Sequence, residues 1–321
     1  MQILVTGGAG YIGSVVCEKL HEQGHALFVI DDLRDGNKNA LTPGAVFFES
    51  DFANAKLLDQ IFSSNTIDLV IHLAASANVP DSVVNPLPYY QNNVSGTITL
   101  LQKMQAYGVK KIIFSSTAAV YGEPQFIPIT ESHPLVPVNP YGWSKLFDEQ
   151  IIKDCAHSFG LSFYIFRYFC AAGATGAHGE SRICESHLIP LAIDAAIGKR
   201  ESLFVFGNNF NTIDGSGVRD YIHVEDIANA HLLCLNSPID NWNKTFNLGT
   251  SNGFSVLEII KATETIIGKE LTFKIVDKRP GDPASLIASS DFAFKNIGWK
   301  PNFSLEQIID SAYRWRMNPL Y

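Results

Sequence analysis

The sequence has few cysteines and no long apolar run. Its five cysteines are an odd number, are scattered, and include no Cys-x-x-Cys pair: Cys17, Cys155, Cys170, Cys184 and Cys234. This distribution argues against a disulfide scaffold and a structural zinc site, and it favours a reducing compartment. No apolar stretch approaches the roughly 20 residues of a membrane-spanning helix, and no signal-like segment begins the chain. We therefore expect a cytoplasmic protein that binds neither a metal nor a membrane.

Positive charge is also scarce. Lys and Arg number 24 against 32 for Asp and Glu, which gives a formal net charge of -8 at pH 7. This balance argues against a nucleic-acid-binding surface, although it leaves room for a local basic pocket. Only 17% of the 321 residues are charged and 46% are hydrophobic, so the chain is not a disordered one.

Short apolar segments alternate with helical patterns in the first half of the chain. Strands are predicted at residues 3–5, 27–30, 46–49, 69–73, 111–115 and 163–167. Helices are predicted at residues 11–23, 56–62, 89–107 and 141–159. This alternation is typical of βαβ units around a buried parallel sheet. The predicted fold class is therefore α/β, with a Rossmann-type doubly wound parallel sheet.

The second half is less regular and is broken by turn signals. Residues 255–258 form a capping-box sequence, which predicts a helix that runs to about residue 267. Five prolines within residues 124–140 predict a long loop without regular structure. We place a soft boundary after residue 169, with a Rossmann domain in residues 1–169. Residues 170–321 are then expected to form mainly a smaller, interleaved C-terminal lobe that binds the substrate.

A glycine-rich turn follows the first predicted strand and opens the first predicted helix. It contains Gly7, Gly10 and Gly13. Glycine lets the backbone approach a pyrophosphate, which then lies at the positive N-terminus of the helix. Asp31 ends the second predicted strand, where a carboxylate binds a ribose 2′-hydroxyl and repels a 2′-phosphate. The pattern predicts NAD rather than NADP, and Arg34 is the one nearby residue that favours NADP.

Tyr141 and Lys145 occupy positions i and i+4 of a predicted helix, so their side chains lie on one face. The lysine ammonium and a nicotinamide cation would both favour the phenolate, which makes Tyr141 a usable base near neutral pH. Thr117 follows a predicted strand, at the edge where open α/β sheets bind ligands, and its hydroxyl can bind a reacting oxygen. Tyr-x-x-x-Lys alone is common, and the dinucleotide motif upstream makes it meaningful here.

Together these residues resemble the extended short-chain dehydrogenase/reductase superfamily. Further segments narrow the resemblance to the family of UDP-glucose 4-epimerases, over essentially the whole chain. These segments are residues 72–75, 89–94, 167–169, 218–224 and 279–282. The segments that contain Arg219 and Arg279 are the most specific for nucleotide-sugar epimerases.

The resemblance implies a tightly bound NAD and a UDP-sugar substrate, which is epimerised by transient oxidation at C4 and return of the hydride to the opposite face. Thr117, Tyr141 and Lys145 match the catalytic positions. Positions that match the cofactor contacts are Gly7, Gly10, Tyr11, Ile12, Gly13, Asp31, Asp51, Phe52, Asn93, Tyr141, Lys145 and Tyr168. Positions that match the substrate contacts are Thr117, Cys170, His187, Leu188, Phe206, Arg219, Arg279, Asp282 and Leu286.

Two departures from the family pattern bear on the reaction. Cys170 stands where the family often has an asparagine, and a thiol is a poor hydrogen-bond donor. Ala118 and Ala119 follow Thr117, where related dehydratases carry an acidic pair that elimination needs. The alternatives left open are an epimerase for UDP-N-acetylglucosamine or a UDP-pentose, a dehydratase or reductase, and a non-catalytic NAD-sensing protein.

Several histidines have chemistry that these motifs do not use. His178 and His187 stand near Cys184 and Glu185, but the spacing is irregular and we expect no metal site there. His72 and His223 lie in apolar sequence, so we expect both to be buried and hydrogen-bonded core residues.

We also expect a homodimer, formed through the helices at residues 93–107 and 144–159. Apolar residues spread over more of the second helix than one sheet contact needs, which predicts a second buried face. They are Leu146, Phe147, Ile151, Ile152, Cys155 and Phe159.

Overall fold

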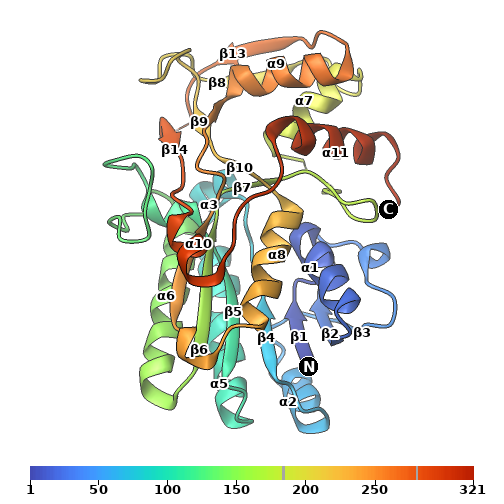
Figure 1. Ribbon diagram of the computed structural model, residues 1–321, viewed down its shortest axis with the longest axis vertical. Coiled ribbons are helices and arrows are strands. Elements are labelled where there is room, and N and C mark those ends of the chain that lie inside the picture. The colour runs from blue at the N-terminus through green and yellow to red at the C-terminus, as the bar shows by residue number, and fades with distance from the viewer. Residues whose placement is uncertain (183–184, 280) are drawn as a thin grey trace. The chain divides into compact units, whose positions relative to one another are not determined.

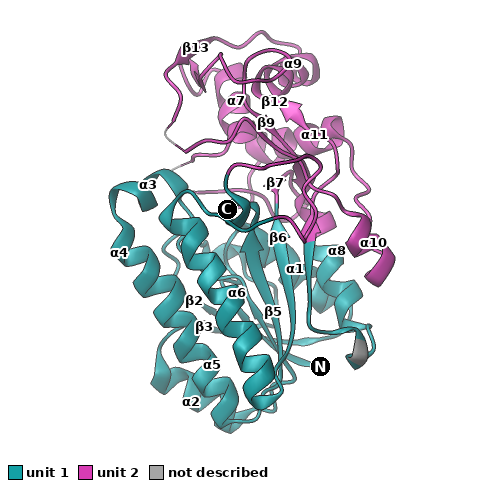
Figure 2. Ribbon diagram, turned by 90° about the vertical axis from the view of Figure 1, so that its left-hand side faces the viewer, with its two compact units in different colours: residues 1–122, 134–168, 228–246 teal, residues 123–133, 169–227, 247–321 magenta. Residues whose placement is uncertain are grey.

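The computed structural model describes residues 1–182, 185–279 and 281–321. The chain divides into two compact units, shown in different colours in Figure 2. Unit 1 comprises residues 1–122, 134–168 and 228–246, and unit 2 comprises residues 123–133, 169–227 and 247–321. Each unit is therefore assembled from segments that are separated in the sequence. No helix within the described residues is long and apolar enough to cross a bilayer.

Unit 1 is built on a seven-stranded sheet in the order β11-β6-β5-β4-β1-β2-β3 (Figure 1). The strands are β1 (Gln2–Thr6), β2 (Ala26–Asp31), β3 (Val46–Glu49), β4 (Leu69–His72), β5 (Lys111–Thr117), β6 (Ser162–Tyr168) and β11 (Lys244–Leu248). All neighbours from β3 to β6 are parallel. The order reverses between β1 and β4, as in doubly wound dinucleotide-binding sheets. The predicted α/β class is confirmed.

Helices cover both faces of this sheet, so its central strands are buried and apolar. On one face lie α2 (Ala55–Ser64), α5 (Gly96–Ala106) and α6 (Pro140–Phe159); on the other lie α1 (Tyr11–Glu22) and α8 (Val224–Leu235), as Figures 1 and 2 show together. The first face packs Leu58, Leu100 and Ile152 against strand residues such as Ile112.

The single helix predicted at residues 89–107 is divided into three pieces. After α3 (Val79–Val84), the chain forms α4 (Pro86–Tyr89), a π-helical turn over Tyr90–Ser95, and then α5. The π-helical turn contains Asn93, whose side chain is buried. Such turns are often found near functional sites.

The described part of unit 2 packs three helices around an apolar core: α7 (Leu188–Ala196), α9 (Val256–Ile267) and α11 (Leu305–Met317). Short strands surround them: β7 (Cys170–Ala172) with β10 (Tyr221–His223), β8 (Leu203–Phe206) with β13 (Phe273–Val276), and β9 (Val218–Arg219) between β12 (Phe254–Ser255) and β14 (Ser285–Leu286). One further helix is α10 (Asp291–Ile297).

Two local predictions are confirmed: the capping box in the second half of the chain and the irregular loop at residues 124–140. Ser255 and Glu258 form both hydrogen bonds of the capping box, and α9 begins directly after Ser255. Between a short 3-10 turn at Ala118–Tyr121 and the start of α6, the chain forms no helix or strand beyond a single bridge from Ile129 to Ala288.

Candidate active site

The glycine-rich turn lies where the strand order of the sheet reverses. Gly7 follows β1 with a φ of +75°, and a Cβ at this position would lie 2.6 Å from the backbone nitrogen of Ala74, which follows β4. Gly10 caps α1 without any side-chain hydrogen bond, and no acidic residue lies in the first turn. A helix N-terminus without an acidic side chain or a side-chain cap favours an anion, so the turn fits a pyrophosphate.

Asp31 is held at the end of β2 by two backbone amides. Its carboxylate accepts hydrogen bonds from Ala9 and from Leu33, each at 2.9 Å. Burial raises the pKa of Asp31, and these two hydrogen bonds oppose the shift. Arg34, the residue that favoured NADP, pairs instead with Asp32 at 2.7 Å.

Strand β5 and helix α6 bring the three proposed catalytic residues into unit 1. The Lys145 ammonium is buried and donates to the Ser115 carbonyl oxygen at 2.8 Å. Burial lowers the pKa of Lys145. The Thr117 hydroxyl oxygen accepts from the backbone of Ala119 at 3.1 Å. A Cβ on Gly142 would lie 2.7 Å from the Ala119 carbonyl oxygen, so the first turn of α6, with Tyr141, packs against the residues that follow Thr117.

The other predicted cofactor positions also lie in unit 1. Asp51 accepts from Ala53 at 2.7 Å, and the buried Phe52 packs on His72, with ring centroids 4.9 Å apart. Tyr11 and Ile12 lie half-buried in the first turn of α1, after Gly10 and before Gly13.

Two of these cofactor positions are engaged in internal hydrogen bonds. The Asn93 amide donates to the hydroxyl of Ser144 at 2.9 Å and bonds the backbone of Ser76 in both directions. The Tyr168 hydroxyl lies 3.1 Å from His231 Nε2, and burial raises the pKa of this tyrosine. Asn93 therefore connects α6 to the segment that follows β4.

Unit 2 holds the predicted nucleotide residues. Arg219 lies on β9, donates to the Val218 carbonyl oxygen at 2.8 Å and contacts Asp282 at 3.4 Å. Leu286, on β14, pairs with Arg219 in the sheet register. The Arg279 guanidinium lies 3.7 Å from the centroid of the Phe206 ring. Two guanidiniums, an aromatic ring and a carboxylate are thus presented by one unit.

The remaining substrate positions of unit 2 lie at element boundaries. Cys170 begins β7, and burial raises the pKa of its thiol to about 11, so it stays a neutral thiol. His187 precedes α7, and its Nδ1 lies 2.7 Å from Glu180 Oε1. Leu188 is the first residue of α7.

Comparison with known proteins identifies the group to which this sequence belongs. The sequence model described as NAD dependent epimerase/dehydratase family matches residues 3–249. The chain belongs to this family. The resemblance seen in the motifs is thereby confirmed.

Three epimerases are similar to this chain over nearly its whole length. The UDP-glucose 4-epimerase of Halalkalibacterium halodurans is 49% identical over 98% of this chain and 95% of its own. The structure of UDP-glucose 4-epimerase from Bifidobacterium longum in complex with NAD+ and UDP is 37% identical, with a TM-score of 0.94 and 99% of each chain covered. The UDP-Glc/GlcNAc 4-epimerase from Campylobacter jejuni is 38% identical, with a TM-score of 0.84, and covers 98% of this chain and 99% of its own.

Sequence reasoning missed the buried network beneath the family's Tyr-x-x-x-Lys motif. Arg167, on β6, donates to both oxygens of Glu149, at 2.9 and 2.6 Å, and to the Tyr121 hydroxyl at 2.8 Å. Ser116 also donates to Glu149, at 2.6 Å. An arginine next to the last residue of an otherwise largely apolar strand was the signal for such a buried partner.

A second anchor was missed in unit 2. The buried carboxylate of Asp220 accepts from the backbone and hydroxyl of Thr250, and from the backbone of Ser251 and Ala288, at 2.6 to 3.1 Å. Asp220 therefore fixes the strand position of its neighbour Arg219.

Both core histidines behave as expected. His72 is buried and lies within hydrogen-bond distance of the hydroxyls of Thr6 and Thr97, at 2.6 and 3.0 Å. Burial lowers the pKa of His72 to about 3, so it is neutral. His223 is also buried, and its Nε2 lies 3.1 Å from the Ser311 hydroxyl.

The acidic cluster near His187 includes a carboxylate that is paired with an arginine. Glu180, Glu185 and His187 bring their ligand atoms within 4.8 Å of one another. However, Arg182 pairs with Glu180 at 2.9 Å, so this carboxylate already has a positive partner. Cys184, like Pro280 of the Arg279 segment, lies outside the described residues. His178 lies 3.4 Å from the Tyr321 hydroxyl.

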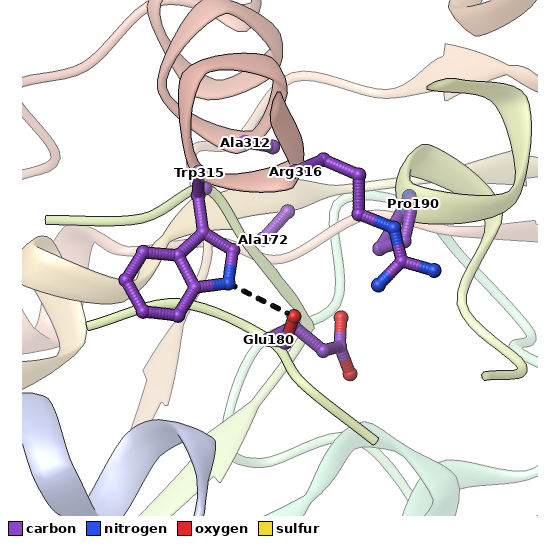
Figure 3. A pocket seen from close by; sticks show the side chains of 7 residues that line it. Ala172, Glu180, Pro190, Ala312, Trp315 and Arg316 are labelled. Atoms are coloured by element: carbon purple, nitrogen blue, oxygen red, sulfur yellow. Dashed lines mark hydrogen bonds between the residues drawn. The ribbon is translucent and has the colours of Figure 1, made fainter. Parts of the chain in front are cut away.

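A small pocket lies beside this cluster in unit 2. Figure 3 shows Trp315 and Arg316 of α11 next to Glu180, and the Trp315 indole donates to the Glu180 carbonyl oxygen at 3.2 Å. Ala172, Pro190 and Ala312 complete the wall that the figure labels. The space is only water-sized and cannot hold a nucleotide. None of these six residues is among the predicted site positions.

Proposed function

We propose that this protein catalyses the NAD-dependent 4-epimerisation of a UDP-sugar and interconverts UDP-glucose and UDP-galactose. The observation that carries the proposal is the set of Thr117, Tyr141 and Lys145 on the sheet unit that bears the dinucleotide turn. The arginines of unit 2 then select a nucleotide-sugar. Unit 1 holds NAD, and unit 2 holds most of the UDP-sugar.

The residues of unit 1 fit NAD. The uncapped N-terminus of α1 binds the pyrophosphate, and Asp31 binds the adenosine ribose hydroxyls. Bound NAD supplies the acceptor and donor of the hydride at sugar C4, so the overall reaction is redox-neutral. Because each turnover regenerates NAD, the cofactor can stay bound from one turnover to the next.

Tyr141 accepts the proton of the sugar 4-hydroxyl at its Oη and later returns it. A lysine ammonium stabilises the phenolate form of a nearby tyrosine, and Lys145 is buried where its charge is weakly screened. The Thr117 oxygen already accepts from Ala119, so its single hydroxyl hydrogen can be donated to the sugar oxygen. Thr117 therefore orients the oxygen whose proton Tyr141 takes.

The unit 2 residues match the parts of UDP. Arg219 and Arg279 bind the diphosphate, because guanidiniums form two parallel hydrogen bonds to phosphate. Phe206 stacks on uracil, and Asp282 accepts from ribose hydroxyls. His187 and Leu188 lie at the start of α7, where backbone amides and the side chain contact the nucleotide.

A second candidate function is epimerisation of UDP-N-acetylglucosamine. It is favoured by Leu286 and by the short Cys170 side chain, which leave space around the sugar. Ala118 and Ala119 argue against a dehydratase, because neither provides an acid or base for elimination. An intact Tyr141 and Lys145 argue against a protein that only senses NAD.

The test is an assay of the purified protein without added NAD. We expect epimer formation from UDP-galactose and from UDP-glucose, and mass spectrometry of the denatured protein should detect NAD. Activity on a UDP-pentose alone would show that the substrate is a UDP-pentose rather than a UDP-hexose. A continuous requirement for NADH would indicate a reductase. If the protein contains NAD but converts none of these sugars, its function would be to sense NAD.

We infer that the protein works as a homodimer in the cytoplasm. Of the six apolar residues expected to span two faces of α6, Ile152 is buried in the core of unit 1, and Ile151, Cys155 and Phe159 pack against that core. Phe147, another of the six, is exposed on α6 together with Trp143, with ring centroids 5.7 Å apart, and Tyr90 lies next to Phe147. An exposed aromatic patch of this kind is typical of an interface.

Light scattering tests the homodimer. At micromolar concentration the mass should be about twice the 35.3 kDa of one chain. Phe147→Asp should shift it towards one chain, and a single-chain mass for the parent protein would overturn the inference. The cytoplasmic assignment rests on the cysteines: Cys17, Cys155, Cys170 and Cys234, the four in the described residues, are all free thiols.

A further inference from the structure

One loop of unit 2 joins two of the proposed nucleotide residues. It runs over residues 207–217, between Phe206 at the end of β8 and the strand β9, which carries Arg219. The loop is closed on itself, because the backbone amide of Phe210 donates to the carbonyl oxygen of Gly215 at 2.9 Å. The path of this loop therefore helps to set where Phe206 and Arg219 lie relative to each other.

Asp214 holds the second half of this loop. Its Oδ1 accepts from the backbone amide of Ser216 at 2.8 Å and from the hydroxyl of the same residue at 2.7 Å. Its Oδ2 accepts from the hydroxyl of Ser255, the residue that caps α9. Ser216 is 0% exposed and Ser255 is 4% exposed, so these hydrogen bonds are largely shielded from water. Asp214 therefore ties the loop to the start of α9.

The carboxyl group of Asp214 is ionised at neutral pH. Burial raises its pKa, but the hydrogen bonds from Ser255 and Ser216 outweigh burial and hold the pKa below its usual value. Ser255 also accepts from the backbone amide of Glu258 at 3.0 Å, so its single hydroxyl hydrogen is free for the carboxylate. A charged acceptor makes such hydrogen bonds stronger than a neutral acceptor would. The contact between the loop and α9 is therefore charge-assisted.

The partners of Asp214 lie next to Arg219. Ser216 precedes Gly217, where a Cβ would lie 3.4 Å from a terminal nitrogen of Arg219, so the guanidinium lies against this glycine. Ser255 ends β12, which pairs with the strand of Arg219 in antiparallel register. The two serines thus connect Asp214 to both the backbone and the guanidinium of the residue proposed to bind the diphosphate.

The first half of the loop is held by the segment that carries Arg279. Lys278 donates to the carbonyl oxygen of Asn209 at 2.9 Å, and its ammonium lies 4.1 Å from the centroid of the Phe210 ring. Ile213, by contrast, is fully exposed. The loop is therefore held on either side of a side chain that faces solvent, which provides an internal control.

We propose that Asp214 is a positioning residue for the nucleotide, which holds Arg219 in the orientation that binds the diphosphate. This rests on the proposed function, because it takes Arg219 as a diphosphate contact. Asp214 acts through Ser216 and the start of α9 rather than by contact with the nucleotide. Its effect falls on nucleotide binding and not on the proton and hydride transfers, because the three proposed catalytic residues belong to unit 1.

The experiment compares wild-type protein with Asp214→Ala, which removes all three hydrogen bonds. Calorimetry with UDP should show a Kd raised about tenfold, as expected for a loop that keeps its binding arrangement about one tenth of the time. KM for UDP-galactose should rise in parallel, whereas kcat and NAD content should not change. Asp214→Asn keeps an acceptor for Ser216 and should recover part of the affinity.

The matched control is Ile213→Ala, which changes a fully exposed side chain next to Asp214 in the same loop. Its Kd for UDP and its KM should match the wild type. Ser216→Ala tests the other end of the contact, because it removes one hydroxyl from Asp214 and leaves the cap of α9 in place. Its Kd should rise, but less than that of Asp214→Ala. Should Asp214→Ala not fold, Asp214→Asn and Ser216→Ala decide the same question, since each should still raise the Kd.

The outcomes separate this proposal from the proposed function. If wild-type protein binds UDP but epimerises no UDP-sugar, the Kd values alone still measure the role of Asp214. Equal Kd values in the wild type and the folded variants would overturn that role. A fall in kcat and NAD content with an unchanged KM would also overturn it, because that pattern marks a residue that only stabilises the fold. If wild-type protein binds no UDP, the assignment of Arg219 and the role of Asp214 fail together.

Discussion

The guanidinium of Arg279 stacks on the ring of Phe206, with 3.7 Å between the guanidinium carbon and the ring centroid. This cation–π contact joins the strand β8, which Phe206 ends, to the segment that follows β13. Because the two side chains support each other, the proposed contacts to uracil and to diphosphate depend on one another.

Arg279→Lys should therefore weaken UDP binding more than the loss of one hydrogen bond would. Lysine keeps the charge but loses the planar group that stacks on Phe206 and binds phosphate through two hydrogen bonds. We expect a loss of at least about tenfold in affinity, which corresponds to about 1.4 kcal/mol. Calorimetry with UDP measures this, and NAD content serves as the control. Equal affinity in the two proteins would contradict the assignment of Arg279.

Tyr141→Phe should abolish most epimerisation and leave NAD bound. The ring is kept, so the packing of α6 against the residues after Thr117 should not change. General acid–base groups contribute on the order of 10²–10⁴-fold, and kcat should fall by that amount. The measurement is epimer formation by a folded, NAD-loaded variant. Full activity in such a protein would exclude Tyr141 as the base.

Asp31→Asn should reduce the preference for NAD over NADP. The substitution keeps an acceptor for the ribose hydroxyl and removes the charge that repels a 2′-phosphate. The preference should narrow by about tenfold or more, equivalent to about 1.4 kcal/mol. Mass spectrometry of the dinucleotide extracted from each protein gives the result. NADP in the parent protein would contradict the role of Asp31. It would indicate that Arg34, which is paired with Asp32 here, accommodates the 2′-phosphate.

Leu286→Tyr should suppress turnover of UDP-N-acetylglucosamine far more than that of UDP-galactose. Leu286 is half-buried and pairs in the register of β14 and β9 with Arg219, which we propose to bind the diphosphate. A larger side chain there would take up space that the sugar substituent needs. One pocket side chain discriminates by about 1–3 kcal/mol. Rates with both substrates, for both proteins, provide the test. Equal losses on the two sugars would remove Leu286 as the size filter.

Glu149→Gln should destabilise the protein strongly. It leaves the buried guanidinium of Arg167 without its carboxylate, and breaking such a pair costs about 3–5 kcal/mol. Neutralising Asp59, which pairs with Lys103 at 2.6 Å nearer the surface, should cost much less, because solvent screens an exposed ion pair. Denaturant unfolding of both variants gives the two free energies. Similar values for the two would show that the Arg167 pair adds no special stability.

The contribution of Glu149 to the free energy of unfolding should decrease as the pH falls. The pKa of Glu149 is lower in the folded protein than its usual value, so its contribution is present above the unfolded pKa. It is lost as the pH falls through the folded pKa. Glu149→Gln should therefore flatten the acid side of the stability curve, as thermal unfolding between neutral and acidic pH would show.

Six of the seven strands of the unit 1 sheet were predicted, because most of them are short apolar runs buried in the sheet, whereas β11 was not predicted. Residues 112–114, at the centre of one predicted strand, are apolar throughout. The six predicted strands differ from the observed ones by at most two residues at either end. The short strands of unit 2 were not predicted. Two residues, as in β9 and in β14, are too few for any periodicity to appear.

The site was predictable only where chemistry depends on neighbours in the sequence. Tyr141 and Lys145 share a helix face, and Gly7 to Gly13 form one turn. The pairing of Arg167 with Glu149 depends instead on which strand lies under α6. The burial of Glu149 was hidden for the same reason, since a charged residue on a helix is ordinarily expected to face solvent.

The position of β11 has a consequence for how the chain folds as it is synthesised. Strand β6 ends at Tyr168, but β11, its neighbour in the sheet, does not begin until Lys244. Until the ribosome has released that later segment, the outer edge of β6 has no strand beside it. An unpaired edge of this kind is a template for pairing with other chains. The nascent protein therefore passes through a stage in which its largest sheet is open at one side, while much of unit 2 is already outside the ribosome.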